Sequence, residues 1–439
     1  MVDIPDDRSL LVATRPVAAV LADVAERVLG AALPIRLRAW DGSEAGPATG
    51  PVAVVRTRRA LRRLLWDPNE LGLARAYVSG DLDVEGDLAE ALARFWALTR
   101  SGRIGRPTVR DKVGLVGNAL RLGIVGPRPA PPGEEARLSG AKHTKVRDRA
   151  AIAHHYDMSN DFYASVLEPN MAYSCGYWTS DAPDYTVEDA QRDKLELVCV
   201  KLGLRPGMRM LDVGCGWGSL ALHAARHHDV HVTGITLSQQ QQEFVQARIE
   251  REGLGDRVEV RLQDYRDLAD EPFDVIGTLE MGEHVGAENY PAYAATLFRM
   301  LKPQGRLLLQ QMSRGAVAQG GGAFIETYIA PDMNMRPVGQ TVDMLESAGL
   351  EVRDVEALRE HYVWTCRAWG ETVERNWGEL VALAGEQTAR VWRLYLAGSA
   401  LAFAENRIGV HQVLAVRPTA EGLSGLPRTR AELLAREPV

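Results

Sequence analysis

The feature that most constrains the fold is a regular alternation of strand and helix patterns that begins near residue 195. The segments typical of strands are 208–216 (MRMLDVGCG), 231–238 (HVTGITLS), 257–265 (RVEVRLQDY), 273–280 (FDVIGTLE) and 306–313 (RLLLQQMS). Helical patterns lie between them, as in residues 238–253 and 290–303. This alternation predicts a parallel sheet with helices on both faces. A helix-rich insertion at about 314–407 precedes a last strand at 410–418, so we expect a doubly wound, Rossmann-like α/β domain.

A glycine-rich turn follows the first of these strands, which ends in Asp212. Three glycines come at alternate positions after it: Gly214, Gly216 and Gly218. Glycines here let the backbone turn tightly and approach a ligand without a Cβ clash. The spacing is not the dinucleotide fingerprint, because Ser219 stands where the third glycine should fall. The second strand lacks the acidic end that NAD enzymes use for the ribose, and the third ends at Asp264. We therefore predict an S-adenosylmethionine site, not an NAD site.

The organisation of the chain predicts three parts: a small N-terminal α/β domain at 1–101, a linker at 102–145 and the doubly wound domain at 146–439. In the first part, a helix is expected at 20–33, a strand at 50–57, and a turn followed by an amphipathic helix at 73–96. The stretch 102–149 holds 11 Lys and Arg against 4 Asp and Glu. Such a segment is either a solvated connector or a patch that meets anionic phospholipid headgroups.

Composition narrows the setting in which the protein works. The net charge of -7 argues against a nucleic-acid binder, and the four widely spaced cysteines suit a reducing cytoplasm and suggest no metal site. The N-terminus has no basic segment before an apolar run, so we expect no secretory signal, and no apolar run is long enough to span a bilayer. We expect a cytoplasmic protein that touches the inner membrane face without crossing it.

Several longer motifs resemble the cyclopropane-fatty-acid synthase family of S-adenosylmethionine-dependent (class I) methyltransferases. Residues 155–178 (HYDMSNDFYASVLEPNMAYSCGYW) carry the entry signature, and LDVGCGWGSLALHAA, VTGITLSQQQ, LQDYRD and EMGEHVG follow in the family's order. The resemblance runs from about residue 154 to the C-terminus and more weakly over 74–88. By position it assigns cofactor binding to Tyr173, Ser174, Gly214, Gly216, Thr236, Gln241 and Asp264. We expect Asp212 and Gly218, which begin and complete the glycine turn, to belong to the same cofactor site.

The resemblance also implies the chemistry: the alkene of a lipid acyl chain takes the methyl group, and a base then removes a proton from the resulting carbocation. Family members resembling this chain hold bicarbonate as that base, between a Cys, a Glu, a His and a Tyr. The Cys and Glu positions are Cys175 and Glu283. The His position is Gln310, and the Tyr position reads as Gly370. Glu280 stands at a commonly small position, and Gly282 replaces a common aromatic residue.

These departures put bicarbonate in doubt and bear on the product. If ring closure is slow, a hydride shift gives an exocyclic methylene instead of a cyclopropane, as in the actinobacterial relatives that begin methyl-branched (tuberculostearic-type) fatty acid synthesis. We expect a 10-methylene chain made from an oleoyl-type phospholipid, with a cyclopropane as the alternative. A separate reductase would then complete the branch. Gln310 should face the methyl-transfer site, whereas Gln311 should point to the opposite face with a structural role.

Aromatic side chains are expected to stabilise the cation and line the acyl-chain site, or else to pack in an ordinary core. The candidates are Tyr156, Phe162, Tyr163, Phe324 and Tyr328. The run 319–324 (QGGGAF) is either a lid or a plain surface loop. By analogy with the family, the N-terminal domain aids membrane contact or self-association as a homodimer. Two other readings stay open: a small-molecule methyltransferase on the same fold, and a catalytically inactive lipid-binding scaffold.

Overall fold

The computed structural model describes residues 15–100, 117–136, 138–156, 159–315 and 321–435 of the 439-residue chain. It divides into two compact units, residues 1–132 and 133–439. The predicted linker 102–145 is shared between them, and residues 101–116 lie outside the described part. Of its basic residues, Arg128 pairs with Asp67, while Lys142 pairs with Asp332. Part of the positive charge is therefore neutralised within the chain.

The first unit holds a four-stranded sheet in the order β2-β1-β3-β4, with β1 and β3 parallel. Its elements are α1 (Val17–Leu29), β1 (Arg36–Arg38), β2 (Glu44–Ala45), β3 (Val52–Val55), α2 (Arg58–Trp66), α3 (Glu70–Val78), β4 (Leu82–Glu85) and α4 (Leu88–Arg100). The helix α1 ends four residues before the predicted limit of 33, because Gly30 takes the left-handed conformation (φ 66°) that stops it. The turn predicted before α4 is instead occupied by most of α3 and by β4, an edge strand of the sheet.

The second unit holds a seven-stranded sheet in the order β10-β11-β9-β8-β5-β6-β7. Its strands are β5 (Arg209–Val213), β6 (His231–Thr236), β7 (Val258–Leu262), β8 (Phe273–Leu279), β9 (Leu301–Arg314), β10 (Glu351–Ala357) and β11 (Ile408–Val416). The strands from β7 to β9 are parallel as predicted, and β11 runs antiparallel to both β9 and β10. The insertion before β11 is thus not wholly helical, since β10 belongs to the sheet.

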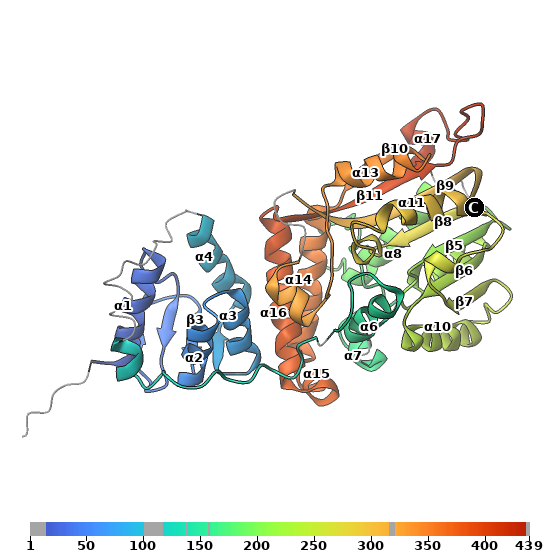
Figure 1. Ribbon diagram of the computed structural model, residues 1–439. Coiled ribbons are helices and arrows are strands. Elements are labelled where there is room, and N and C mark those ends of the chain that lie inside the picture. Colours follow the sequence, from blue (N-terminus) through green and yellow to red (C-terminus); the bar gives the residue numbers. More distant parts are fainter. Residues whose placement is uncertain (1–14, 101–116, 137, 157–158, 316–320, 436–439) are drawn as a thin grey trace, which may run out of the picture. The chain divides into compact units, whose positions relative to one another are not determined.

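Helices cover both faces of this sheet (Figure 1). The helices and 3₁₀ turns of the second unit are α6 (Lys145–Tyr156), α7 (Asn160–Ala164), α8 (Val187–Leu202), α9 (Ser219–His228), α10 (Gln239–Glu252), η1 (Tyr265–Asp267), η2 (Gly282–His284), α11 (Tyr290–Met300), α12 (Ala323–Tyr328), α13 (Val338–Ser347), α14 (Arg359–Arg375), α15 (Trp377–Ala384), α16 (Glu386–Ala404) and α17 (Arg430–Leu434). Apolar residues of α8, α9 and α10 pack on one face, and those of α11 and α13 pack on the other. This burial produces the predicted doubly wound domain.

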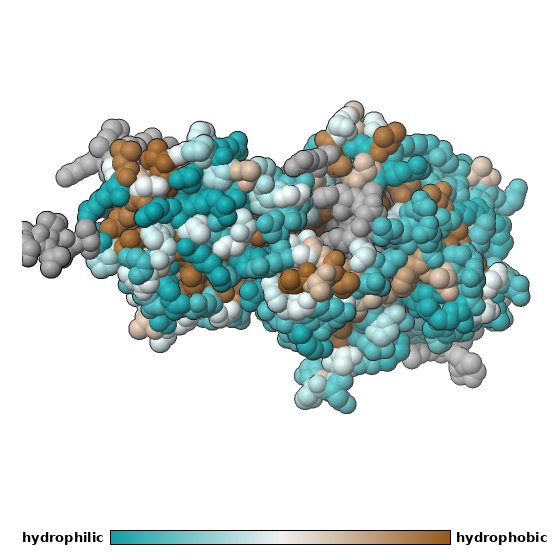
Figure 2. Space-filling view, turned by 90° about the horizontal axis from the view of Figure 1, so that it is seen from below, coloured by the Kyte–Doolittle hydropathy of each residue, from teal (hydrophilic) through white to brown (hydrophobic). Residues whose placement is uncertain are grey.

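The helices α14 and α16 lie side by side and form a separate apolar cluster with α7 (Figure 1). Trp369, Trp392 and Phe162 are buried in this cluster. The face shown in Figure 2 is mixed, with apolar groups scattered among hydrophilic ones. Within the described ranges, none of the helices combines the length and the apolar character needed to cross a bilayer.

Candidate functional site

A cavity lies where β5, β6, β7 and β8 end, which is the edge at which open α/β sheets bind ligands. Eight of the nine residues predicted to bind the cofactor line it: Tyr173, Ser174, Asp212, Gly214, Gly216, Thr236, Gln241 and Asp264. The sequence did not single out Met281, His284 and Pro331, which also line the cavity. The predicted residues therefore come together although they span about ninety positions of the chain.

The glycine turn shapes the floor of this cavity. Gly216 has φ 54° and nothing within 4 Å of a built Cβ, so it leaves open space for a ligand. A Cβ at Gly214 (φ 78°) would lie 2.9 Å from Cγ of Met281. Gly218 (φ 80°) does not line the cavity, because its Cα faces Val245 of α10, whose Cγ1 would lie 2.9 Å from a Cβ. Its role is to pack α9 against α10, which corrects its placement among the ligand-contacting residues.

Asp212 gives the cavity an unsatisfied negative group. Its side chain is buried, and Oδ2 has no hydrogen-bond partner within the described part of the chain. Burial raises the pKa of Asp212 to about 7, although the charge of Lys194 opposes the shift. A buried acceptor without a partner suits a cationic ligand, which would compensate its desolvation. The residues present therefore fit S-adenosylmethionine, which carries a sulfonium and an ammonium group.

Other predicted cofactor residues are already engaged with protein neighbours. Both oxygens of Asp264 accept hydrogen bonds from the Arg266 guanidinium, at 2.8 and 2.6 Å. The Thr236 hydroxyl donates to Oε1 of Gln241 at 2.8 Å. These contacts fix the rotamers at the ends of β6 and β7.

Glu280 is the centre of the polar site beside this cavity. Three donors reach its carboxylate: the backbone N–H of Cys175 at 2.7 Å, Nε2 of Gln310 at 3.0 Å and the hydroxyl of Tyr362 at 2.5 Å. Burial raises the pKa of Glu280, while these hydrogen bonds and the charge of Lys194 oppose that rise. The residue stands at φ 54°, a strained conformation for a side chain other than glycine, of the kind found at functional sites.

The orientation of the Gln310 amide follows from a chain of hydrogen bonds that begins at a buried lysine. Nζ of Lys201 donates to Oε1 of Gln412 at 2.8 Å, so Nε2 of Gln412 faces Gln310 and donates to its Oε1 at 3.0 Å. Since an ammonium group can only donate, this order leaves Nε2 of Gln310 as a donor to Glu280. Gln310 therefore faces the site, as its strand position predicts.

Gln311 points to the opposite face of β9, as alternation along a strand requires. Its Oε1 accepts from the hydroxyl of Tyr290 at 2.7 Å. A Cβ on Gly282 would lie 2.1 Å from that oxygen, so the glycine makes room for this hydrogen bond. This gives a packing reason for the missing aromatic side chain at Gly282.

The position expected for a tyrosine ligand was assigned wrongly to Gly370. Gly370 lies eight residues after Tyr362 on α14, which is about 12 Å along the helix. A Cβ at Gly370 would approach only Leu396 of α16, at 3.9 Å. Tyr362 supplies the hydroxyl instead, so this ligand is present in the chain and the prediction of its loss is corrected.

Cys175 and Glu283 complete the polar site. The Cys175 thiol is fully buried and lies 3.3 Å from the carbonyl oxygen of Gly176 as a donor. Burial and the Glu280 charge hold its pKa well above the ordinary range, so it stays protonated. Glu283 is also fully buried: the N–H of Met312 donates to its Oε1, and Oε2 has no partner within the described ranges. Burial and the Glu280 charge raise the pKa of Glu283 to about 8.

The four aromatic candidates whose side chains are described do not line the cavity. Phe162 and Tyr163 are fully buried with Trp392, at ring-centroid distances of 5.4 Å each. Phe324 and Tyr328 are buried against each other at 5.5 Å. Tyr156 ends α6, and its side chain lies outside the described part, as do residues 319–320 of the loop predicted at 319–324. Core packing accounts for the four described rings.

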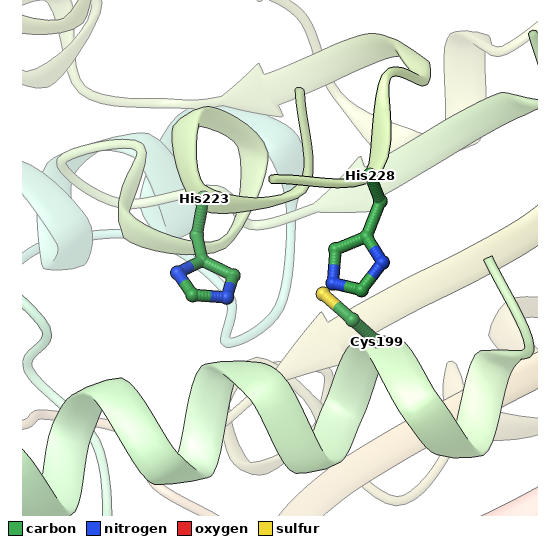
Figure 3. Close-up of side chains that lie close together, drawn as sticks. All are labelled: Cys199, His223 and His228. Atoms are coloured by element: carbon green, nitrogen blue, oxygen red, sulfur yellow. The ribbon is translucent and has the colours of Figure 1, made fainter. Parts of the chain in front are cut away.

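A second polar cluster lies on α8 and α9, away from the cavity. The possible ligand atoms of Cys199, His223 and His228 lie within 4.8 Å of one another (Figure 3). Their spacing in the sequence did not indicate this group. Oε2 of Glu196 already contacts Nε2 of both imidazoles, at 3.3 and 3.2 Å. The histidines therefore have a hydrogen-bonding role without any metal.

Comparison with known proteins agrees with this geometry. The family described as "Mycolic acid cyclopropane synthetase" matches residues 143–413. A probable fatty acid methyltransferase of Mycobacterium tuberculosis is 39% identical over 409 residues, covering 90% of this chain and 93% of the relative. The cyclopropane-fatty-acyl-phospholipid synthase of Escherichia coli K12 is 38% identical, covering 69% and 78%. The tuberculostearic acid methyltransferase UfaA1 of M. tuberculosis is 30% identical, covering 92% and 93%.

A solved structure is similar over the same region. It is that of mycolic acid cyclopropane synthase CmaA1 in complex with SAH and CTAB, with a TM-score of 0.57 and 32% identity, covering 61% of this chain and 97% of that one. Its SAH supports the assignment of the cavity to S-adenosylmethionine.

Proposed function

Because this chain belongs to the mycolic acid cyclopropane synthetase family and is an S-adenosylmethionine-dependent methyltransferase of lipid acyl chains, we propose that it converts an oleoyl-type phospholipid chain to a 10-methylene chain. The bond that is methylated is the cis double bond. The alternative product is a cyclopropane on the same substrate. Each of the two products corresponds to a similar protein: one is named as a tuberculostearic acid methyltransferase, and another as a cyclopropane-fatty-acyl-phospholipid synthase.

The observation that carries the proposal is the fixed amide of Gln310. It donates to Glu280 and accepts from Gln412, so neither of its polar atoms is available to take a proton. An imidazole at this position would add a group that titrates near neutrality. Without an imidazole beside Glu280 to take part in the proton transfer, removal of the proton is slower, and a hydride shift can precede it. The methylene chain follows from that order of events.

When bound, S-adenosylmethionine supplies an electrophilic methyl group. The chain's own residues orient the reactants and accept the proton that the methylated chain loses. Asp212 places negative charge in the cofactor cavity, and Glu280 places a carboxylate at its rim. The buried Lys194 ammonium donates to Oγ of Ser174 at 2.7 Å and offsets part of this negative charge. The methylated carbon is thus expected between the cofactor cavity and Glu280.

We also propose that the substrate chain is drawn from an anionic bilayer surface and that a separate reductase acts on the product. Exposed apolar residues of the first unit support membrane contact: Leu65 is 51% exposed, Trp66 52% and Val125 55%. Trp66 and Val125 are neighbours, since Nε1 of Trp66 donates to the carbonyl oxygen of Gly126 at 3.2 Å. Such a group can enter the headgroup region of a bilayer.

The test is identification of the product. The purified chain is incubated with methyl-labelled S-adenosylmethionine and vesicles of oleoyl phospholipid, and the acyl chains are analysed by mass spectrometry with NMR of the methylene protons. We expect a methylene-branched chain as the main product. A dominant cyclopropane would contradict the proposal, and an absence of labelled lipid together with no binding of S-adenosylmethionine by calorimetry would favour an inactive scaffold.

A further inference from the structure

The carboxylate of Glu280 occupies a pocket of donors that is built from three separate parts of the chain. The N–H of Cys175 comes from the loop after α7, the amide of Gln310 from β9 and the hydroxyl of Tyr362 from α14. Oε1 accepts two of these hydrogen bonds and Oε2 accepts the third. A small oxyanion bound in this pocket would use the same three donors, so the side chain has the place of such an anion.

A free bicarbonate ion fits this pocket poorly. Its donors are already used by the Glu280 carboxylate. A further anion would therefore meet the charge of Glu280 at a site whose donors are already occupied, and like charges repel strongly away from bulk water. The structure disagrees with the expectation of bicarbonate that the family resemblance gives.

We infer that Glu280 is itself the base of the reaction and makes the enzyme independent of bicarbonate. This inference rests on the proposed function, because it needs a methylated acyl cation, but it holds for either product. The alkene π pair forms the new C–C bond as the C–S bond breaks, leaving its electron pair on sulfur. Glu280 then takes one proton from the transferred methyl group. The C–H pair becomes the exocyclic double bond after a hydride shift, or closes the ring without one.

Two neighbouring carboxyl groups with different environments can divide the acid and base roles. Glu280 has three donors from separate parts of the chain, which favour its charged form, whereas Oε2 of Glu283 has no partner among the described residues. Glu283 is therefore the one that holds a proton at neutral pH, and Glu280 is the one left charged. This order keeps a proton acceptor at the rim of the cofactor cavity.

The backbone conformation of Glu280 makes glycine a suitable substitution for testing the inference. Its φ of 54° suits glycine, so Glu280→Gly removes the carboxylate and relieves backbone strain. It also leaves the three donors around an empty space for an added anion. Glu280→Gln is the matched control, because the amide fills the same space without acting as a base.

The experiment measures methyl transfer to oleoyl phospholipid vesicles in buffer freed of carbon dioxide, with and without added sodium bicarbonate or formate. Wild-type activity should be the same in all three conditions. Glu280→Gly should lose roughly 100-fold to 10,000-fold in rate and regain part of it with bicarbonate or formate, and Glu280→Gln should lose as much without recovery. Binding of S-adenosylhomocysteine, measured by calorimetry, should be unchanged in both variants.

Two outcomes overturn the inference: wild-type activity that falls severalfold in carbon dioxide-free buffer and returns with bicarbonate, or a Glu280→Gly variant that keeps the wild-type rate there. Both leave methyl transfer itself intact. A wild-type protein that transfers no methyl group under any condition would instead contradict the proposed function.

Discussion

The hydroxyl of Tyr362 donates a hydrogen bond to Oε2 of Glu280 at 2.5 Å, joining α14 to the end of β8. Among the described residues, Tyr362 is the only donor to this oxygen. The contact orients the carboxylate that we place at the centre of the reaction. It also ties the helical insertion to the cofactor domain.

Tyr362→Phe should therefore slow methyl transfer while leaving the fold intact. Loss of a hydrogen bond to a charged group costs about 1.5–3 kcal/mol, or roughly 10-fold to 100-fold in rate. Calorimetry with S-adenosylhomocysteine should give an unchanged dissociation constant. Tyr185→Phe is the control, since the Tyr185 hydroxyl donates to Oδ2 of Asp193 at 2.7 Å in a partly buried contact that does not involve Glu280. Equal rates in wild type and Tyr362→Phe would contradict the role of this contact.

Gln310→His should shift the product toward cyclopropane. The substitution replaces a fixed amide with a group that can accept a proton, so deprotonation should compete better with the hydride shift. The ratio of the two products is read by mass spectrometry from one reaction. An unchanged ratio at measurable turnover would show that position 310 does not control the outcome.

Gly370→Ala should leave both rate and product ratio unchanged, because a Cβ there meets only Leu396 at 3.9 Å. Alanine within a helix is favoured over glycine by about 0.5–1 kcal/mol, so the free energy of unfolding should rise by about that amount. Urea denaturation measures it. A changed product ratio would restore Gly370 as a determinant and contradict the assignment to Tyr362.

Local patterns were enough to predict the glycine turn, Asp212 and Asp264 of the cofactor site, whereas its other residues were assigned through the family resemblance. The glycine turn and the ends of β5, β6 and β7 are placed by strand periodicity, and parallel strands bring their carboxyl ends to one edge. Tyr362 could not be found this way, since it lies 82 positions from Glu280 and reaches it only through the packing of α14. The helical periodicity of α14 alone does not distinguish Tyr362 from other inward-facing residues, and an assignment eight residues further along missed it.

Prediction from local sequence patterns has the same limit in the first unit. Asp81 and Gly80 were read as part of a turn before α4, and the short strand β4 that follows was missed. Its pairing with β3 is a tertiary contact: Val52 lies opposite Glu85, and Val55 opposite Leu82. Four residues that contain two acids carry little strand signal by themselves, so the neighbouring strand decides their conformation.

Affinity for S-adenosylmethionine should fall as the pH drops below about 7. The pKa of Asp212 is about 7 in the free protein, and a cationic ligand prefers the ionised carboxylate. Below that pKa, the dissociation constant should rise toward about tenfold per pH unit. Calorimetry between pH 5.5 and 8.5 tests this, with Asp212→Asn as the comparison. A variant that keeps the wild-type slope would show that another group controls the dependence.

Glu283→Gln should stabilise the fold more strongly as the pH rises. The pKa of Glu283 is about 8 when folded and close to 4.5 when unfolded, so between these values the folded state binds more protons and its stability falls with increasing pH. Glutamine keeps an acceptor for the N–H of Met312 and has no charge to bury. The gain should be near zero at pH 4.5 and reach a few kcal/mol above pH 8, at about 1.4 kcal/mol per unit of pKa difference. Urea denaturation from pH 4.5 to 8.5 measures it, with exposed Glu288→Gln as the control. A gain that does not change with pH would show that Glu283 is not held protonated, and would remove the division of roles between the two carboxyl groups.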